Sequence, residues 1–155
     1  MAAQGLSFRI ANESDLPAIV RLLAADSMGA NREQYAEPLP RAYRDAFDAM
    51  QAQGDNDYIL AQLDGEIAGC LQLTVIAGVS RSGVSRAQIE GVRVDARYRG
   101  RGIGEALFGH AMDRARAAGC GLVQLTTDKS RPDALRFYER LGFKASHEGM
   151  KLVLD

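Results

Sequence analysis

The chain has 155 residues, of which 46% are hydrophobic and 25% are charged. These values are typical of a soluble globular protein of one domain, and we expect a single domain over residues 1–155. Nineteen Lys and Arg against 20 Asp and Glu give a formal net charge of -1. A charge so close to zero favours neither a nucleic-acid partner nor a disordered acidic chain.

Metal and membrane sites are not expected either. The two cysteines, Cys70 and Cys120, and the two histidines, His110 and His147, do not fall at the spacing of metal ligands. The first residues lack the basic and apolar stretches of a signal peptide, and no apolar run approaches the roughly 18 residues of a membrane helix. The sequence therefore predicts a cytoplasmic protein with reduced thiols, no metal and no membrane partner.

The first half of the chain alternates between strand and helix patterns. The dipeptide Asp64-Gly65 lies between two strand-like runs and is typical of a tight hairpin turn. Asn12 or Ser14 can cap the first helix, in which apolar residues recur at helical spacing. The predicted elements are a strand over 6–11, a helix from about 16, a loop or broken helix over 26–40, a helix over 41–53, and strands over 58–63 and 66–76.

The second half predicts one strand–helix–strand unit and a final strand. Hairpins in the middle of the chain and a late crossover indicate an α/β fold of the mixed α+β kind, with a mixed, mostly antiparallel sheet flanked by about four helices. The predicted elements are a loop over 77–86, a strand over 87–94, a glycine turn, a helix over 103–120, a strand over 121–127, a helix over 131–143 and a strand over 149–155.

The glycine turn is the strongest functional signal. Gly100, Gly102 and Gly104 stand directly before a helical pattern. A strand, a tight turn and a helix start expose several backbone N–H groups toward one point, where the helix dipole adds positive charge. A simpler reading is a glycine-rich connector with solvated arginines. An anion site also explains the four arginines around the turn, which are Arg93, Arg97, Arg99 and Arg101.

Two common phosphate-binding loops do not match this turn. The chain has no Gly-x4-Gly-Lys-Ser/Thr pattern. A dinucleotide fingerprint that starts at Gly100 would need a third glycine where the chain has Glu105. The turn therefore predicts a diphosphate ligand of another kind.

The spacing Arg99-x-x-Gly102-x-Gly104 resembles the signature of the GNAT superfamily of N-acetyltransferases. The stretch "TDKSRPDALRFYERLGF" resembles the second motif of that family, and the order of elements agrees over nearly the whole chain. The resemblance implies a GNAT-like acyl-CoA N-acyltransferase fold and transfer of an acetyl group from acetyl-CoA to a primary amine. Direct attack within a ternary complex is implied as well.

The resemblance also implies where the coenzyme binds. Backbone N–H groups of the turn would hold the pyrophosphate, and the strand before it would pair with the pantetheine arm as if the cofactor were an added strand. Gly91 interrupts the alternation of that strand, where a bulge could open a slot for the thioester. The implied coenzyme residues are Val92, Arg93, Val94, Arg99, Gly100, Arg101, Gly102, Ile103, Gly104, Glu105 and Arg131.

Two residues match the catalytic positions of the family. Glu90 would be the general base, acting through water, and its alternative is a surface charge paired with an arginine. Tyr138 would be the acid that protonates the leaving thiolate, and its alternative is a core aromatic residue. An N–H group of Val92 or Arg93 would stabilise the oxyanion. Arg131 stands where the family often has asparagine, which puts the usual contact of that position in doubt.

The acceptor is not specified by the sequence. By resemblance, the loop between the first two helices and the last hairpin shape its site, and a small amine, an amino-acid-like compound and a protein N-terminus all stay open. Two other functions also stay open: a non-catalytic acyl-CoA sensor and a protein-interaction domain. The family favours a homodimer, and the loop over 77–86 could close the site or contact a second subunit. The acceptor loop contributes Asn31, Arg32, Glu33, Tyr35 and Glu37, of which the acidic residues could attract a cation together with Glu90.

Overall fold

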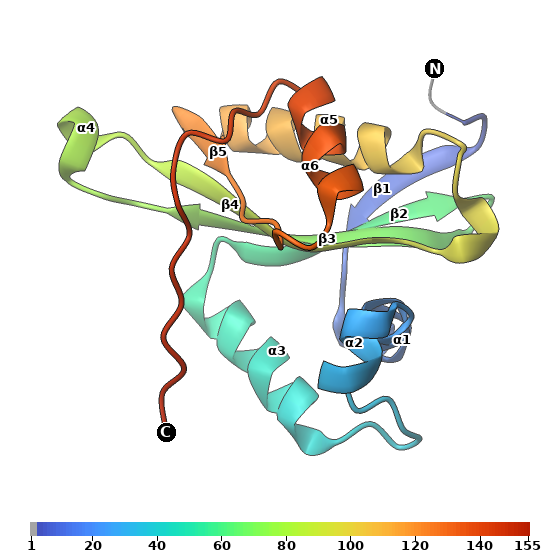
Figure 1. Ribbon diagram of the computed structural model, residues 1–155. Helices are drawn as coiled ribbons and strands as arrows, with labels where there is room; N and C mark the ends of the chain where they lie inside the picture. Colours follow the sequence, from blue (N-terminus) through green and yellow to red (C-terminus); the bar gives the residue numbers. More distant parts are fainter. Residues whose placement is uncertain (1–2) are drawn as a thin grey trace. The chain divides into compact units, whose positions relative to one another are not determined.

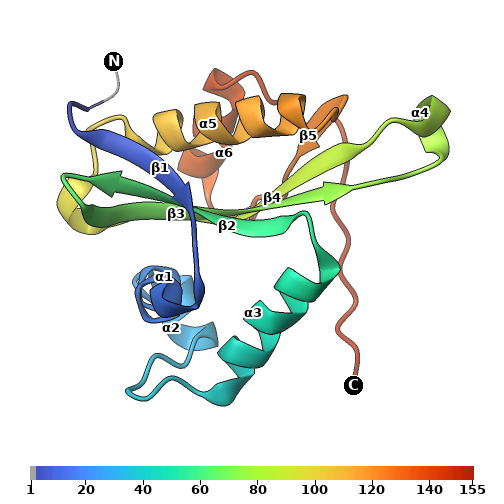
Figure 2. The same cartoon turned by 180° about the vertical axis from the view of Figure 1, so that it is seen from behind.

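The computed structural model describes residues 3–155. The chain divides into two compact units, Met1–Gln124 and Leu125–Asp155, and each is described by itself. The sheet lies in the first unit, which Figures 1 and 2 show from opposite sides.

The sheet of the first unit has five strands in the order β1-β2-β3-β4-β5. The first four strands pair antiparallel, whereas β4 and β5 are parallel, so the predicted mixed, mostly antiparallel sheet is confirmed. Asp64 and Gly65 both have positive φ, of 50° and 85°, as the predicted tight hairpin requires. The strands are β1 (Leu6–Ile10), β2 (Asn56–Leu63), β3 (Glu66–Ile76), β4 (Arg86–Val94) and β5 (Leu122–Gln124).

Helices cover both faces of this sheet. Figures 1 and 2 agree that α1, α2 and α3 lie on one face and α5 on the other. Helices α1 and α3 match the two helices predicted for this part of the chain. Helix α2 forms within the segment predicted to be a loop or broken helix. The helices of the first unit are α1 (Leu16–Ala24), α2 (Ser27–Arg32), α3 (Arg41–Gln53), the short α4 (Ser80–Gly83) and α5 (Ile103–Ala117).

Each face of the sheet has its own apolar core, because side chains alternate along a strand. On the α5 face, the predicted row of Ile103, Leu107, Ala111 and Ala115 is confirmed as buried. On the α1 face, apolar side chains pack in a cluster of buried residues, with Leu23, Tyr58 and Ile67 against it. That cluster consists of Ala11, Ile19, Leu22, Leu60 and Cys70.

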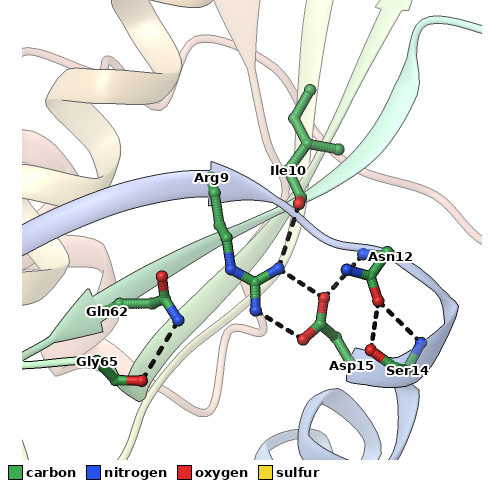
Figure 3. A network of polar contacts seen from close by, with 7 residues as sticks. All are labelled: Arg9, Ile10, Asn12, Ser14, Asp15, Gln62 and Gly65. Atoms are coloured by element: carbon green, nitrogen blue, oxygen red, sulfur yellow. Dashed lines mark hydrogen bonds and ion pairs between the residues drawn. The ribbon is translucent and has the colours of Figure 1, made fainter.

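An ion pair fixes the start of α1 against β1 (Figure 3). Nη1 and Nη2 of Arg9 each donate to a carboxylate oxygen of Asp15 at 2.7 Å. Asp15 also accepts the N–H of Asn12 at 2.8 Å, and Oδ1 of Asn12 accepts the N–H of Ser14 at 3.0 Å. In this reciprocal capping box, Asn12 caps the 3₁₀ turn Glu13–Asp15 that leads into α1. The N-cap residue of α1 itself is Asp15, which makes no side-chain cap bond there.

The second unit contains α6 (Pro132–Arg140). Pro132 occupies the first helical turn, where a missing N–H costs nothing. Gly142 has a φ of 95°, and the N–H of Phe143 donates to the carbonyl of Tyr138 at 3.1 Å, which ends the helix. The predicted helix and its glycine stop are therefore confirmed, although the helix is shorter than residues 131–143.

The predicted strand over 149–155 is wrong, since these residues pair with no strand. Met150, Leu152, Val153 and Leu154 are all more than 80% exposed. The strand propensity of a segment describes how well its residues would fit into a sheet. It does not tell whether the sheet has a free edge with which residues 149–155 could pair. The strand expected over 121–127 is likewise reduced to β5, and the helix expected over 103–120 ends at Ala117.

No helix among residues 3–155 combines the length and the apolar composition that crossing a membrane requires.

Asp15→Asn should lower the free energy of unfolding at pH 7 by about 1–3 kcal/mol, because it removes a charged partner of Arg9. Hydrogen bonding from Arg9 lowers the pKa of Asp15 below its ordinary value of 3.8. A carboxylate with a lowered pKa stabilises the fold fully above about pH 5 and loses that effect as the pH falls through its folded pKa. Urea unfolding between pH 3 and pH 7 should therefore show the difference between wild type and variant shrinking toward acid. Asp113→Asn, in an exposed pair with Arg116, should change little at any pH.

Candidate functional site

A β-bulge in β4 dominates the geometry of the candidate site. In the pairing of β3 with β4, Gln72 lies opposite Glu90 and Cys70 lies opposite Arg93. One residue of β3 therefore faces two residues of β4, Gly91 and Val92. Gly91 has a φ of 59°, a conformation that side chains with a Cβ rarely adopt. The bulge predicted at Gly91 is confirmed.

Side chains satisfy the carbonyl groups of the bulge. The thiol of Cys70 donates to the Gly91 carbonyl at 3.7 Å, and Nη1 of Arg93 donates to the Val92 carbonyl at 2.8 Å. The backbone N–H of Arg93 hydrogen-bonds the sulfur of Cys70, while burial raises the pKa of that thiol to about 12. Both carbonyl groups of the bulge are thus held by side chains of β3 and β4.

The other edge of β4 pairs with β5 from Arg86 to Gln88. Within residues 3–155, no strand pairs with this edge beyond Gln88, and we call this part the open edge. The N–H of Asp95 donates to Ala68 of β3 at 2.8 Å, and successive backbone groups of a strand point to opposite edges. The N–H and carbonyl of Val94 consequently face the open edge. This places unpaired strand backbone beside the bulge, where an extended ligand could add to the sheet.

Polar residues line the α1 face of the sheet beside the bulge. Tyr58, Gln72 and Glu90 lie opposite one another on β2, β3 and β4, so they share this face. Burial raises the pKa of Tyr58, and the charges of Glu33 and Glu90 raise it further. The Tyr58 hydroxyl therefore stays protonated over the physiological range, and it can donate or accept a hydrogen bond beside Glu90.

Glu33 follows α2 and is held by α3. The hydroxyl of Tyr43 donates to its carboxylate at 2.8 Å and accepts the N–H of Gln34, also at 2.8 Å. Its charge acts on Tyr58, as does the charge of Glu90. The predicted acceptor loop therefore has a fixed carboxylate near the polar face of the sheet.

The rest of that loop is tied to α1 and α2. Nη2 of Arg21 donates to the hydroxyl of Tyr35 at 2.6 Å, and this hydroxyl donates to Glu37 at 2.8 Å. The amide of Asn31 donates to the Ser27 carbonyl at 3.0 Å. Of the predicted acidic residues, Glu37 is thus engaged with Tyr35 at the surface.

The glycine turn leads from β4 into α5. Gly100 and Gly102 have φ of 77° and 73°, and Gly102 occupies the N-cap position without a side chain that could cap the helix. The first hydrogen bond of α5 runs from the N–H of Ala106 to the carbonyl of Gly102 at 3.0 Å. The N–H groups before Ala106 point out of the helix end, which is the geometry of an anion site.

Arginines surround this helix start. The guanidinium carbons of Arg97 and Arg101 lie 5.0 and 5.6 Å from the centroid of the Tyr98 ring. Arg97 also pairs with Asp95 at 2.9 Å, and its hydrogen bond lowers the pKa of that carboxyl group. Arg99 and Arg101 are exposed. The basic character predicted for the turn is therefore present at its surface.

Tyr138 and Arg131 belong to the second unit. The Tyr138 ring is half-buried on α6 and makes edge contacts with Phe137 at 5.6 Å and Phe143 at 6.1 Å between ring centroids. Arg131 is exposed at the N-terminus of α6, where its N–H donates to the Asp128 carbonyl at 3.0 Å.

The structure brings most of the predicted site residues together in the first unit. Glu90, the bulge residues, the open strand edge and the glycine turn all belong to β4 or to the segment that follows it. Sequence reasoning missed Tyr58, Cys70 and Asp26, which meet the bulge or Arg93. The feature that brings Tyr58 and Cys70 to this place is the register of the strands. Two bulges shift that register: the one in β4, and a second one where β2 and β3 pair, between Ala61 and Gln62. Within residues 3–155 no group of three or more His, Cys, Asp or Glu residues could hold a metal ion.

The family model described as "Acetyltransferase (GNAT) family" matches residues 23–143. The chain belongs to the GNAT family of acetyltransferases, whose members use acetyl-CoA as co-substrate. The predicted family and fold are thereby confirmed, and acetyl-CoA-dependent N-acetyl transfer is the function that its relatives support.

The chain is similar to several named N-acetyltransferases. It is 39% identical over 94 residues to a glucosamine 6-phosphate N-acetyltransferase of Trypanosoma brucei brucei. The aligned residues make up 60% of this chain and 61% of that protein. It is 36% identical over 107 residues to an aminoalkylphosphonate N-acetyltransferase of Salmonella typhimurium, and the aligned residues make up 69% of each chain. The chain thus spans about two thirds of the length of these curated relatives.

Solved structures agree with the fold. A protein of Bacillus halodurans C-125 described as a transcriptional regulator is 49% identical, with a TM-score of 0.92 over 96% of this chain and 99% of that one. An acetyltransferase of Trypanosoma brucei is 30% identical, with a TM-score of 0.76 over 96% of this chain and 99% of that one.

Proposed function

We propose that this chain transfers the acetyl group of acetyl-CoA to a cationic primary amine, by direct attack within a ternary complex. The observation that carries the proposal is the bulge of β4, which joins an open strand edge to a carboxylate. The Glu90 side chain lies on the polar face of the sheet, which it shares with Tyr58 and near which Glu33 lies. The backbone of Val92 to Val94 follows Glu90 along the same strand. An amine and an acetyl thioester could therefore meet at this strand.

The coenzyme would bind along β4 and at the glycine turn. Free N–H groups at the start of α5 suit the pyrophosphate, since they act together with the helix dipole. The open edge at Val94 suits the amides of the pantetheine arm. The family-level use of acetyl-CoA supports both placements. The proposed coenzyme residues are Val92, Arg93 and Val94, through backbone groups and not side chains, together with Arg99, Gly100, Arg101, Gly102, Ile103, Gly104, Glu105 and Arg131.

Glu90 would take the proton of the ammonium through a water molecule, so that the amine nitrogen can attack the thioester carbon. The Val92 N–H is our choice of oxyanion donor, because the N–H of Arg93 faces Cys70. When the C–S bond breaks, the hydroxyl of Tyr138 would protonate the coenzyme thiolate. The nitrogen, which became cationic on attack, loses its second proton to solvent as the amide forms. Solvent then restores the proton of Tyr138 and takes the proton held by Glu90.

The charges on the α1 face favour a cationic acceptor. Glu33 and Glu90 both act electrostatically on Tyr58. Arg93, the cation that acts on the same hydroxyl, already pairs with Asp26 at 3.1 Å. A small amine that is cationic at both ends would therefore be held better than one carrying a phosphate or carboxylate.

We also propose a single-domain, cytoplasmic homodimer. The family match crosses the boundary between the two units, which supports one domain. Cys70 and Cys120 are both free thiols, as in a reducing compartment. Val79 and Val84, which flank α4, are 94% and 38% exposed and could contact a second copy.

Gly102→Val should weaken binding of coenzyme A far more than Arg101→Ala. A β-branched residue at a φ of 73° is strained and would move the N–H groups of the helix start, whereas Arg101 contributes one exposed charge. Calorimetry should show a dissociation constant raised by about 30-fold or more for Gly102→Val and about threefold for Arg101→Ala. Equal losses would contradict the view that backbone donors hold the diphosphate.

Glu90→Gln and Tyr138→Phe should each lower kcat by about 10²–10³-fold, because each removes a proton-transfer group. Both variants should bind acetyl-CoA as the wild type does. Glu139→Gln, an exposed neighbour of Tyr138, is the control and should be fully active. Wild-type turnover in both variants would disprove the assigned roles. Coenzyme binding by the wild type without turnover on any amine would instead favour the acyl-CoA sensor.

A panel of amines should identify the acceptor class. Acetyl-CoA consumption should be faster with diamines than with amino acids, amino sugar phosphates or peptides. Glu33→Gln should raise the KM of a diamine by about tenfold and leave the KM of acetyl-CoA unchanged, because it removes one acceptor-side charge. Preference of the wild type for a phosphorylated amine would overturn the cationic class.

A further inference from the structure

The side chain of Arg93 connects the bulge to the helices of the opposite layer. It lies two residues after Gly91 and is 15% exposed. Without the bulge, Glu90 and Arg93 would point to opposite faces of the sheet, since they are three residues apart. The extra residue brings both to the α1 face, where they lie opposite Gln72 and Cys70.

Two contacts hold the guanidinium of Arg93 in place. Its Nη1 donates to the Val92 carbonyl at 2.8 Å, and its Nε lies 3.1 Å from Oδ2 of Asp26. The second contact is an ion pair without the geometry of a hydrogen bond. One side chain therefore joins the backbone of the bulge to the segment between α1 and α2.

Asp26 in turn fixes the start of α2. Its Oδ1 accepts the N–H of Gly29 at 2.5 Å, which caps the helix. Gly29 is buried so tightly that a Cβ would lie 1.7 Å from the Leu23 carbonyl. Because α2 is packed this closely against the end of α1, Asp26 has little freedom to move away from Arg93.

The end of α2 leads directly to Glu33. The N–H of Glu33 donates to the Gly29 carbonyl at 2.8 Å, so the helix start and the acceptor-side carboxylate lie within one short segment. A displacement at Asp26 is therefore passed to Glu33 through fewer than two turns of helix.

We propose that Arg93 is a positioning residue, which sets the distance between the bulge of β4 and the acceptor loop through Asp26. This inference rests on the proposed function of the same site. In the wild type, the charge pair holds Glu33 where it can bind the acceptor beside Glu90. Loss of the pair loosens the acceptor side, while the turn and the strand edge still hold the coenzyme.

Steady-state kinetics of Asp26→Asn and Arg93→Gln test the proposal. Asp26→Asn keeps an oxygen that caps α2 but removes the charge. Each variant should raise the KM of the acceptor by about tenfold, with the KM of acetyl-CoA within about twofold of wild type. Arg93→Lys should be intermediate, since one ammonium cannot reach both Asp26 and the Val92 carbonyl. The double variant should lose no more than either single one.

Arg9→Gln is the matched control, because Arg9 also pairs a strand with the capping aspartate of a helix. It should lower Tm without changing the acceptor KM. If Arg93→Gln lowers Tm and leaves the acceptor KM unchanged, as the control does, Arg93 is a structural residue and the proposal is wrong. An equal rise in the KM of both substrates would also overturn it.

Hydrogen exchange of the free protein separates this proposal from the proposed function. Arg93→Gln should speed exchange at the amides of Gly29 and Glu33, whereas Arg9→Gln should not. Unchanged exchange at both amides would overturn the positioning role, whatever the kinetics show. If the wild type acetylates no amine and exchange still rises, the proposed function fails and Arg93 is retained as the residue that positions α2.

Discussion

One extra residue in β4 determines most of the candidate site. The bulge at Gly91 and Val92 changes which way every later side chain of the strand points, so Glu90 and Arg93 share a face. It also allows the Cys70 thiol and the Arg93 guanidinium to reach the carbonyl groups of the strand. Beyond Gln88, no strand within residues 3–155 pairs with the outer edge of β4. The site thus follows from a local change in register rather than from an elaborate loop.

The fold was largely predictable because its signals are local. Asp64-Gly65 specifies a hairpin, and Gly102 before a helical pattern specifies a helix start, whatever the rest of the chain does. Residues 149–155 show the limit of such signals: their composition favours a strand, but pairing depends on an edge elsewhere. The short β5 and the early end of α5 have the same cause, since element boundaries depend on tertiary neighbours.

The candidate site was predictable only in part. Glu90 and the glycine turn were found because a family motif marks them in the linear sequence. Tyr58 and Asp26 were not found, because their meeting with β4 depends on two register shifts that no spacing rule reveals. A regular hairpin would place Tyr58 opposite Leu71 and away from Glu90. The residues that we propose to bind the acceptor are thus the ones that the linear sequence describes least.

The protonated thiol of Cys70 has a practical consequence for handling the protein. Nucleophilic attack on alkylating agents and aromatic disulfides requires a thiolate, and a buried thiol with a pKa of about 12 supplies almost none near neutral pH. Cys120 is half-buried, and burial raises its pKa as well. Coenzyme released in solution has an accessible thiol, so a colorimetric thiol reagent would register the product against a low protein background. The same burial shields the bulge from oxidation, because a sulfur that is not accessible to peroxide cannot begin the path to sulfenic acid.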